Sequence, residues 1–111
     1  MSKLQKLLDK QAELDERIRE ERDLKWDDPQ SEMNDLCTAM ANEVEELRDL
    51  TSWKWWADDT RIDYDEATEE LIDILHFWLS AANLLGMDAD SILETYLGKN
   101  ETNHERQDEG Y

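Results

Sequence analysis

Four acidic residues form two pairs with helical spacing. The pairs are Glu43-x-x-Glu46 and Glu70-x-x-Asp73, and a separation of three residues places both carboxylates of a pair on one face of a helix. Each pair interrupts an apolar pattern, so these carboxylates border the buried side of their helices, where unpaired negative charge is costly. Two such helices that face each other would form a cage of oxygen ligands for divalent cations. Mg²⁺ favours carboxylates together with substrate phosphates, which indicates phosphate chemistry.

The residues around the two pairs help to decide whether their spacing indicates a metal site. The chain holds 30 acidic residues, so pairs with this spacing also arise by chance on a solvated surface. Asp73, however, stands between Ile72 and Ile74, and we therefore expect its carboxylate not to point freely into solvent. A cage of four acids without metal would also titrate as a coupled group, because each negative charge opposes the ionisation of its neighbours.

The composition predicts one all-α domain. The chain has 111 residues with three Gly and one Pro, which suits a single domain and leaves few residues for hairpin turns. A net charge of −18 argues against direct binding to a nucleic-acid backbone, because such binding depends on clustered Lys and Arg. The single Cys37 excludes an intramolecular disulfide and fits a reducing compartment. No apolar run approaches membrane-spanning length, and we expect a cytoplasmic protein with no membrane partner.

The apolar periodicity predicts about four helices in a compact bundle. They are expected at residues 3–23, 31–50, 65–85 and in a short segment that ends near Leu97-Gly98. Residues 26–30, which contain the only Pro, read as a linker, with N-cap candidates in Ser31–Asn34. Gly86 suits the C′ position after the third helix, and Asp88 or Asp90 suits the cap of the fourth. The domain would span residues 1–98, followed by a polar tail at 99–111.

Three blocks of sequence resemble the dimeric dUTPases, a family of the all-α, MazG-type nucleoside triphosphate pyrophosphatases. The first block is residues 43–47 with Trp53-Lys54-Trp55-Trp56, which is similar to an E-x-x-E-L…W-K-x-W pattern. The second is residues 70–80, similar to E-x-x-D-x-x-H-F-x-L-S, and the third is the K-N-x-x-N-x-x-R-Q-x-x-G-Y ending at residues 99–111. The acid pairs alone are a weak signature, and the tail is the discriminating part.

The resemblance implies hydrolysis of dUTP to dUMP and pyrophosphate by a metal-activated water. The catalytic and metal-binding residues would be Glu43, Glu46, Glu70 and Asp73. They would hold two or more Mg²⁺ ions, with Mn²⁺ as a substitute. Bound ions would cancel phosphate charge and lower the pKa of the attacking water. Either Glu43 or Glu46 would accept the proton of that water.

The resemblance also implies contacts to the rest of the nucleotide. Phosphate contacts would come from Lys54, Lys99 and Arg106. The nucleoside-binding residues would be Gln11, Asp15, Trp56, His76, Phe77, Asn103 and Tyr111. We expect residues 99–111 to form an arm that orders over the substrate and excludes water, although a polar end of a chain is, taken alone, more typical of a solvated segment.

Asp15 departs from the family pattern. Gln11-Ala-Glu-Leu14-Asp15 is similar to the base-reading element Q-x-x-L-N, with an acid in place of the amide. A carboxylate only accepts hydrogen bonds. It therefore suits the amino group of cytosine or the N3–H of uracil, but it cannot donate to uracil O4. The choice between dUTP, dCTP and a broader set of deoxynucleoside triphosphates stays open.

A second departure concerns the length of the chain. Only about 20 residues separate Phe77 from Lys99, where better-known family members carry an additional helical stretch. We therefore expect a second subunit to complete each site, in a homodimer or a dimer of dimers, with the apolar helix at 65–85 as the interface. The rival class is an acidic nucleic-acid mimic or another helical interaction protein. A mimic would need outward-facing acids and would not need Lys99 and Arg106.

Overall fold

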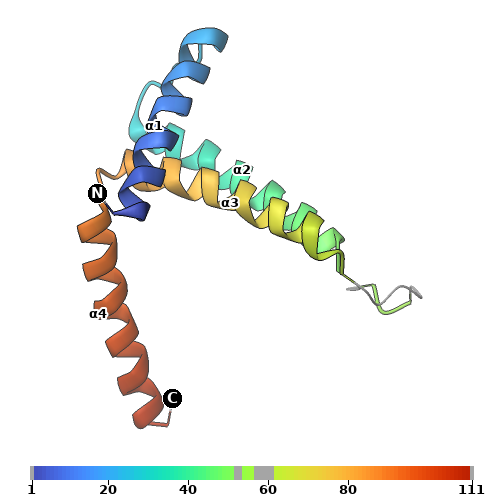
Figure 1. The fold of residues 1–111 in the computed structure, drawn as a ribbon, viewed down its shortest axis with the longest axis vertical. Helices are drawn as coiled ribbons and strands as arrows, with labels where there is room; N and C mark the ends of the chain where they lie inside the picture. Colours follow the sequence, from blue (N-terminus) through green and yellow to red (C-terminus); the bar gives the residue numbers. More distant parts are fainter. Residues whose placement is uncertain (1, 52–53, 57–61, 111) are drawn as a thin grey trace.

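The protein is all-α, as a computed structural model that describes residues 2–51, 54–56 and 62–110 shows (Figure 1). Its helices are α1 at Lys3–Arg22, α2 at Pro29–Asp49, α3 at Tyr64–Leu84 and α4 at Ala89–Asp108. The prediction of an all-α fold with four helices is confirmed over these ranges. None of the described helices is long and apolar enough to cross a membrane.

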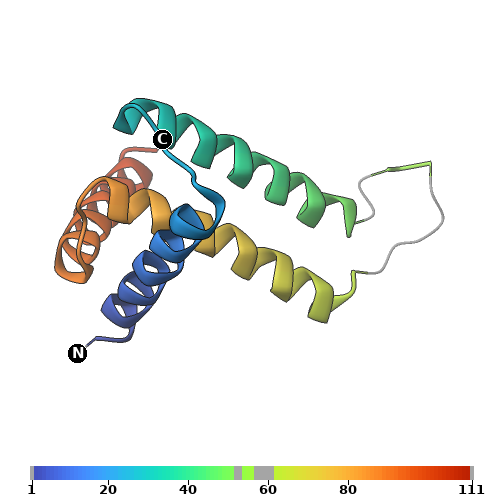
Figure 2. The same ribbon diagram turned by 90° about the horizontal axis from the view of Figure 1, so that it is seen from above.

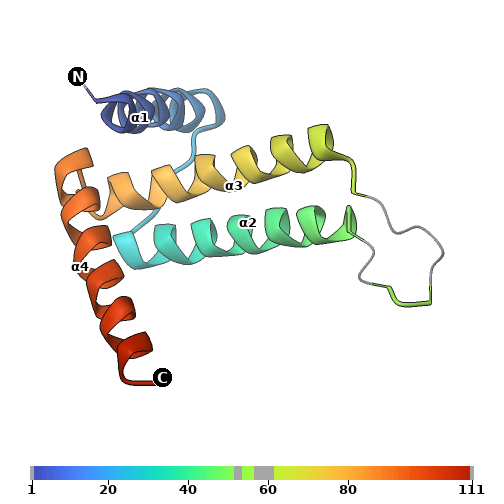
Figure 3. The same cartoon turned by 60° about the horizontal axis from the view of Figure 1, so that its bottom comes forward.

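The helices α2 and α3 form an antiparallel hairpin, lying side by side in every view (Figure 1, Figure 2 and Figure 3). Figure 3 shows α3 in the middle, with α1 on one side of it and α2 on the other. The helix α1 crosses the C-terminal part of α3, where Ser80 and Asn83 both hydrogen-bond to α1. One end of the hairpin is therefore covered by α1, and the other end leads into the α2–α3 connection.

The start of α2 lies earlier than the sequence predicted. Asp28 is the N-cap, and its carboxylate accepts a hydrogen bond from the backbone N–H of Ser31 at 2.7 Å. Pro29 occupies the first helical position, where a missing N–H costs nothing and the fixed φ angle suits the helix. The prediction of a linker through residue 30 and an N-cap within Ser31–Asn34 is wrong, because it treated Pro29 as a breaker instead of a helix start.

The caps around α3 and α4 follow the sequence signals more closely. Asp63 caps α3 by accepting hydrogen bonds from two backbone N–H groups of the first turn. Gly86 has a φ of 73°, which confirms it as the left-handed C′ residue. Asp88 is confirmed as the cap of α4, in a reciprocal capping box with Ser91. These residues set the sharp turn from α3 into α4.

The helix α4 continues well beyond its expected end near Leu97-Gly98. It runs to Asp108 and includes Gly98 in its interior; a glycine there costs about 1 kcal/mol relative to alanine. The residues of α4 after Gly98 contain no Pro, and several of those at 99–108 are good helix formers. The predicted end is therefore wrong. The role of residues 99–111 as a substrate-binding arm remains a prediction.

The hydrophobic core of the single chain is small. Among the described residues, its buried apolar side chains are Leu8 of α1 with Leu79 and Ala82 of α3, and no residue of α4 is buried. The helix α4 runs away from the rest of the molecule (Figure 1). The radius of gyration is accordingly 17.5 Å, against about 13 Å for a compact domain of this size.

Candidate metal and nucleotide site

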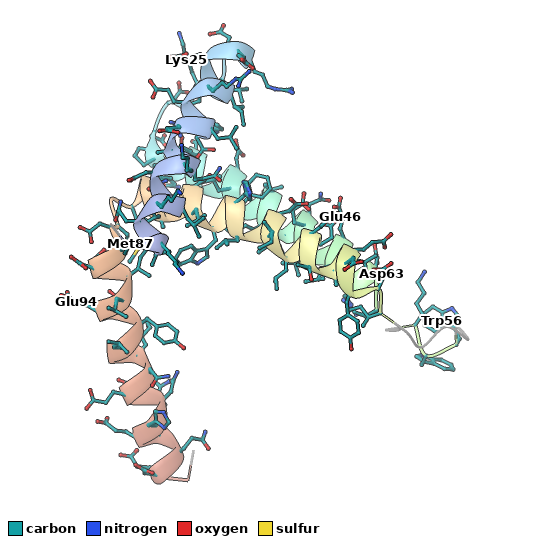
Figure 4. All side chains as sticks on the ribbon, in the orientation of Figure 1. Lys25, Glu46, Trp56, Asp63, Met87 and Glu94 are labelled. Atoms are coloured by element: carbon teal, nitrogen blue, oxygen red, sulfur yellow. The ribbon has the colours of Figure 1, made fainter. Side chains whose placement is uncertain are left out.

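Three of the four predicted ligands come together between α2 and α3. Glu43 and Glu46 of α2 and Glu70 of α3 each offer a carboxylate oxygen, and these three oxygens lie within 4.8 Å of one another. The spacing of three residues places both α2 acids toward α3, as expected for one face of a helix. We call Glu43, Glu46 and Glu70 the carboxylate cluster. Figure 4 shows Glu46 part-way along the hairpin, between α1 and the α2–α3 connection.

The carboxylate cluster holds buried oxygens that lack hydrogen-bond partners. Glu43 Oε2 and Glu70 Oε2 are both buried without a partner among the described residues. The pKa of Glu43 is raised from 4.5 to about 7, chiefly by desolvation and also by the neighbouring Glu70 and Glu46. Buried carboxylates with unsatisfied oxygens are costly unless a proton or a cation compensates them.

The chemistry of these donors fits Mg²⁺. This ion takes hard oxygen ligands and is commonly held by one or two carboxylates with substrate phosphates and water. Glu43, Glu46 and Glu70 would hold it from both helices, with the two buried oxygens as ligands. Glu46 is exposed and Glu43 and Glu70 are half-buried, so the cluster is open to an incoming phosphate on one side.

Asp73 lies apart from the carboxylate cluster. It follows Glu70 by one turn of α3, but none of its oxygens joins the set within 4.8 Å. The expectation that Asp73 would not point freely into solvent is wrong for the single chain, since the residue is exposed. The flanking Ile72 is also exposed, because this side of α3 is not covered by α1 or α2. Its assignment as a metal ligand stays a prediction.

A cavity opens on the same hairpin, between the cluster and α1. Its volume is about 250 Å³, and its walls come from α1, the α1–α2 connection, α2 and α3. Most of its lining is apolar, including Trp26 and the predicted nucleoside residue Phe77. Two aromatic side chains in a concave pocket of this kind suit a flat ring.

Asp15 lies at the wall of this cavity and is held by two neighbours. Its Oδ1 accepts a hydrogen bond from Gln11 Nε2 at 2.9 Å, and its Oδ2 accepts one from Ser80 Oγ at 2.6 Å. Gln11 and Ser80 are buried, with exposed fractions of 6% and 8%. The predicted residues Gln11, Asp15 and Phe77 are therefore brought to one place. Ser80, which the sequence reading left without a role, joins them.

Three further polar residues at the cavity, Arg19, Glu32 and Asp35, had not been singled out from the sequence, and Trp26 connects them. Arg19 Nη2 and Glu32 Oε1 form an ion pair at 2.7 Å, and the Arg19 guanidinium lies over the Trp26 ring at 5.7 Å. Trp26 Nε1 donates a hydrogen bond to Asp35 Oδ2 at 2.8 Å. These contacts join α1, its following connection and α2, so no spacing within one helix could have indicated them.

The remaining predicted residues lie elsewhere in the single chain. Lys54 and Trp56 are exposed in the α2–α3 connection, and Trp56 packs edge-on against Trp55 with ring centroids 5.5 Å apart. Figure 4 places Trp56 at the end of the hairpin remote from α1, and thus away from the cavity. His76 is exposed on α3. The expected roles of these three residues stay predictions.

The described tail residues do not approach the carboxylate cluster of their own chain. Lys99, Asn103 and Arg106 are exposed on α4, and α4 runs away from the hairpin that carries Glu46 (Figure 4). Tyr111 lies outside the described residues. Contacts from these side chains to a nucleotide remain predictions.

Comparison with known proteins identifies the family of the chain. A family model described as dUTPase matches residues 3–85 and 78–111, and the chain therefore belongs to this dUTPase family. A dCTP pyrophosphatase from Enterobacteria phage T4 is 34% identical over 93 residues, which cover 72% of this chain and 54% of that protein. The chain thus spans about half the length of this curated relative. No solved structure matches the chain.

Proposed function

We propose that the protein is a Mg²⁺-dependent pyrophosphatase that hydrolyses a pyrimidine deoxynucleoside triphosphate, dUTP or dCTP, to the monophosphate and pyrophosphate. The observation that carries this proposal is the carboxylate cluster, with its two unsatisfied buried oxygens, on the same hairpin as an aromatic cavity. The dUTPase family and the phage T4 dCTP pyrophosphatase support the same reaction class.

The spacing along the hairpin fits one nucleotide. Glu70 of the cluster and Phe77 of the cavity are seven residues apart on α3, which corresponds to about 10 Å along a helix. This separation suits a base in the cavity and phosphates at the cluster. The β- and γ-phosphates would then extend toward the α2–α3 connection, which contains the exposed Lys54.

Different residues of the chain would bind the metal, accept the proton and orient the nucleoside. Bound Mg²⁺ supplies charge neutralisation at the phosphates and a more acidic water. Glu43, Glu46 and Glu70 would hold the cation from both helices, and either Glu43 or Glu46 would accept the proton of the attacking water. The cavity orients the nucleoside, so that attack and departure of pyrophosphate occur in a fixed geometry.

A hydrolysis panel over the common deoxynucleoside triphosphates tests this proposal. With Mg²⁺, we expect pyrophosphate release from dUTP or dCTP at least about tenfold faster than from dATP or dGTP, because the family and the phage T4 relative are both named for pyrimidine substrates. EDTA should stop the reaction, and Mn²⁺ should restore it. The proposal fails if no triphosphate releases pyrophosphate with either metal, or if hydrolysis continues unchanged with EDTA.

We also propose that a second copy of the chain completes each site. The single chain leaves Leu71 and Trp78 of α3 and its C-cap residue Leu85 exposed, and their spacing of seven residues places them in one stripe along the helix. The helix α4 exposes Leu93, Tyr96 and Leu97 in the same way. Apolar stripes of this size on a molecule with so small a core favour burial in a homodimer or a dimer of dimers.

A complementation experiment tests this arrangement. One chain carries Glu70→Gln, and the other lacks residues 99–111 but keeps the α4 stripe; each alone should be inactive. If residues 99–111 of one subunit contact the partner's carboxylate cluster, an equal mixture of the two variants should recover about a quarter of wild-type activity. Half of the dimers then contain one chain of each kind, and one of the two sites in each mixed dimer is intact. No recovery, or a monomer in sedimentation velocity runs of the wild type, would contradict the proposal.

A further inference from the structure

We infer that Asp15, held by Gln11 and Ser80, makes the cavity select a pyrimidine with an amino group at C4, as in cytosine, over one with a carbonyl there, as in uracil. The inference rests on the proposed function and narrows its substrate to dCTP. Asp15 would contact the base, and Ser80 is a positioning residue that acts through Asp15.

Asp15 is the acceptor in each of the hydrogen bonds that hold it. Gln11 Nε2 donates to Asp15 Oδ1 at 2.9 Å and to Ser80 Oγ at 3.2 Å, and Ser80 Oγ donates to Asp15 Oδ2 at 2.6 Å. A hydroxyl has one hydrogen, so Ser80 has none to spare for a ligand while it bonds to Asp15. The ionised Asp15 has no hydrogen to give and keeps acceptor capacity on both oxygens. Asp15 therefore offers hydrogen-bond acceptors to a ligand, and Ser80 offers it no donor.

The rest of the cavity strengthens this preference. Trp26 Nε1 already donates to Asp35, and the Arg19 guanidinium pairs with Glu32 while it lies over the Trp26 ring. Asp15, Asp35 and Glu32 thus line the cavity with a single guanidinium among them. An excess of negative charge in a partly desolvated pocket favours a ligand that presents donors.

The two pyrimidines differ at the position that such a wall would sense. The C4 amino group of cytosine donates to a carboxylate, whereas uracil O4 only accepts and would face the Asp15 oxygens without a hydrogen between them. Uracil can offer only one hydrogen, its N3–H, and its O4 then stays beside the carboxylate unpaired. Cytosine leaves its N3 unpaired, but its amino group supplies two hydrogens to the acceptors of this wall. A hydrogen bond to a charged group is strong enough to separate the two bases by about 10- to 100-fold.

The solvent side of α1 supplies a matched control. Gln5 Nε2 donates to Asp9 Oδ1 at 2.9 Å, with the same spacing of four residues as Gln11 and Asp15. Asp9 is exposed. Asp9→Asn therefore makes the same chemical change in the same kind of pair, away from the cavity.

The experiment measures kcat/KM for dCTP and dUTP, with Mg²⁺, in wild type and variants. Wild type should prefer dCTP by about 10- to 100-fold. Asp15→Asn should lower this preference at least about tenfold, because an amide can donate to O4. Ser80→Ala should lower it less, and Ser80→Thr, which keeps the hydroxyl, should restore it. Asp9→Asn should match wild type. Damage to packing alone would slow both substrates equally and leave the ratio unchanged.

The outcomes separate this inference from the proposed function. If wild type prefers dUTP, or if Asp15→Asn leaves the ratio unchanged while both substrates are hydrolysed, the inference is overturned and the proposed function stands. If wild type hydrolyses neither substrate, the proposed function fails. Calorimetric titration with dCMP and dUMP then still tests the inference, which requires tighter binding of dCMP and loss of that preference in Asp15→Asn. The helical signal in far-ultraviolet circular dichroism serves as the control that each variant is folded.

Discussion

Glu70→Gln is expected to reduce pyrophosphate release by about a thousandfold or more, with the helices intact. Glu70 is the only α3 residue in the carboxylate cluster, so its loss would leave a bound cation with cluster ligands from α2 alone. Metal ions contribute several kcal/mol to the stabilisation of charge in such a transition state, and each 1.4 kcal/mol is a factor of ten in rate. The amide keeps the shape of the side chain and removes the charge.

Glu69→Gln is the matched control for this variant. Glu69 is the preceding residue on α3, is exposed, and does not belong to the cluster. Its rate should stay close to that of wild type. The measurement is steady-state pyrophosphate release over a range of Mg²⁺ concentrations, so that weaker metal binding is separated from slower turnover. A Glu70→Gln enzyme with more than a tenth of wild-type kcat at saturating Mg²⁺ would remove Glu70 from the metal site.

Glu43→Gln is expected to stabilise the metal-free protein at pH 8. Burial and neighbouring carboxylates raise the pKa of Glu43 to about 7 in the folded chain, from 4.5. The folded state thus binds this proton more tightly than the unfolded state does. Its stabilising contribution is complete below about pH 4.5 and is lost as the pH rises through about 7. The melting temperature of the metal-free wild type should therefore fall across this range, and less steeply in Glu43→Gln, which mimics the protonated form.

The control for this second experiment removes one charge outside the cluster. Glu45 is an exposed neighbour on α2 that pairs with Arg48 at 3.8 Å across the surface, and such pairs contribute little stability. Glu45→Gln should keep the pH dependence of wild type. Mg²⁺ should raise the melting temperature of wild type at pH 8, because it takes the place of the proton. Equal slopes in wild type and Glu43→Gln would show that Glu43 does not carry this titration.

The local features of the fold were readable from single stretches of sequence. Helix content followed from composition and apolar periodicity, and Gly86 and Asp88 marked the turn between α3 and α4 through their own conformational preferences. The helix boundaries at Pro29 and Gly98 were misjudged. Both residues are tolerated in helices at a cost that depends on position, and a pattern of residue types does not show that position.

The acid pairs show what the sequence spacing alone can predict about the site. A separation of three residues determines that Glu43 and Glu46 share a face of α2, and it does so before any packing occurs. Whether that face meets Glu70 depends on the register of α2 against α3. The packing brings Glu70 to the cluster and leaves Asp73 exposed in the single chain.

Local stretches of sequence were enough to identify the helices, the two acid pairs and their resemblance to a nucleotide-hydrolysing family. Which side chains share a site followed only from the packing of the helices. Gln11 and Ser80 are 69 residues apart in the chain, and Arg19 meets Glu32 across two helices. Such contacts form because distant segments bury a common surface, and no local preference encodes them. The acceptor-lined wall at Asp15 is therefore a property of the folded chain.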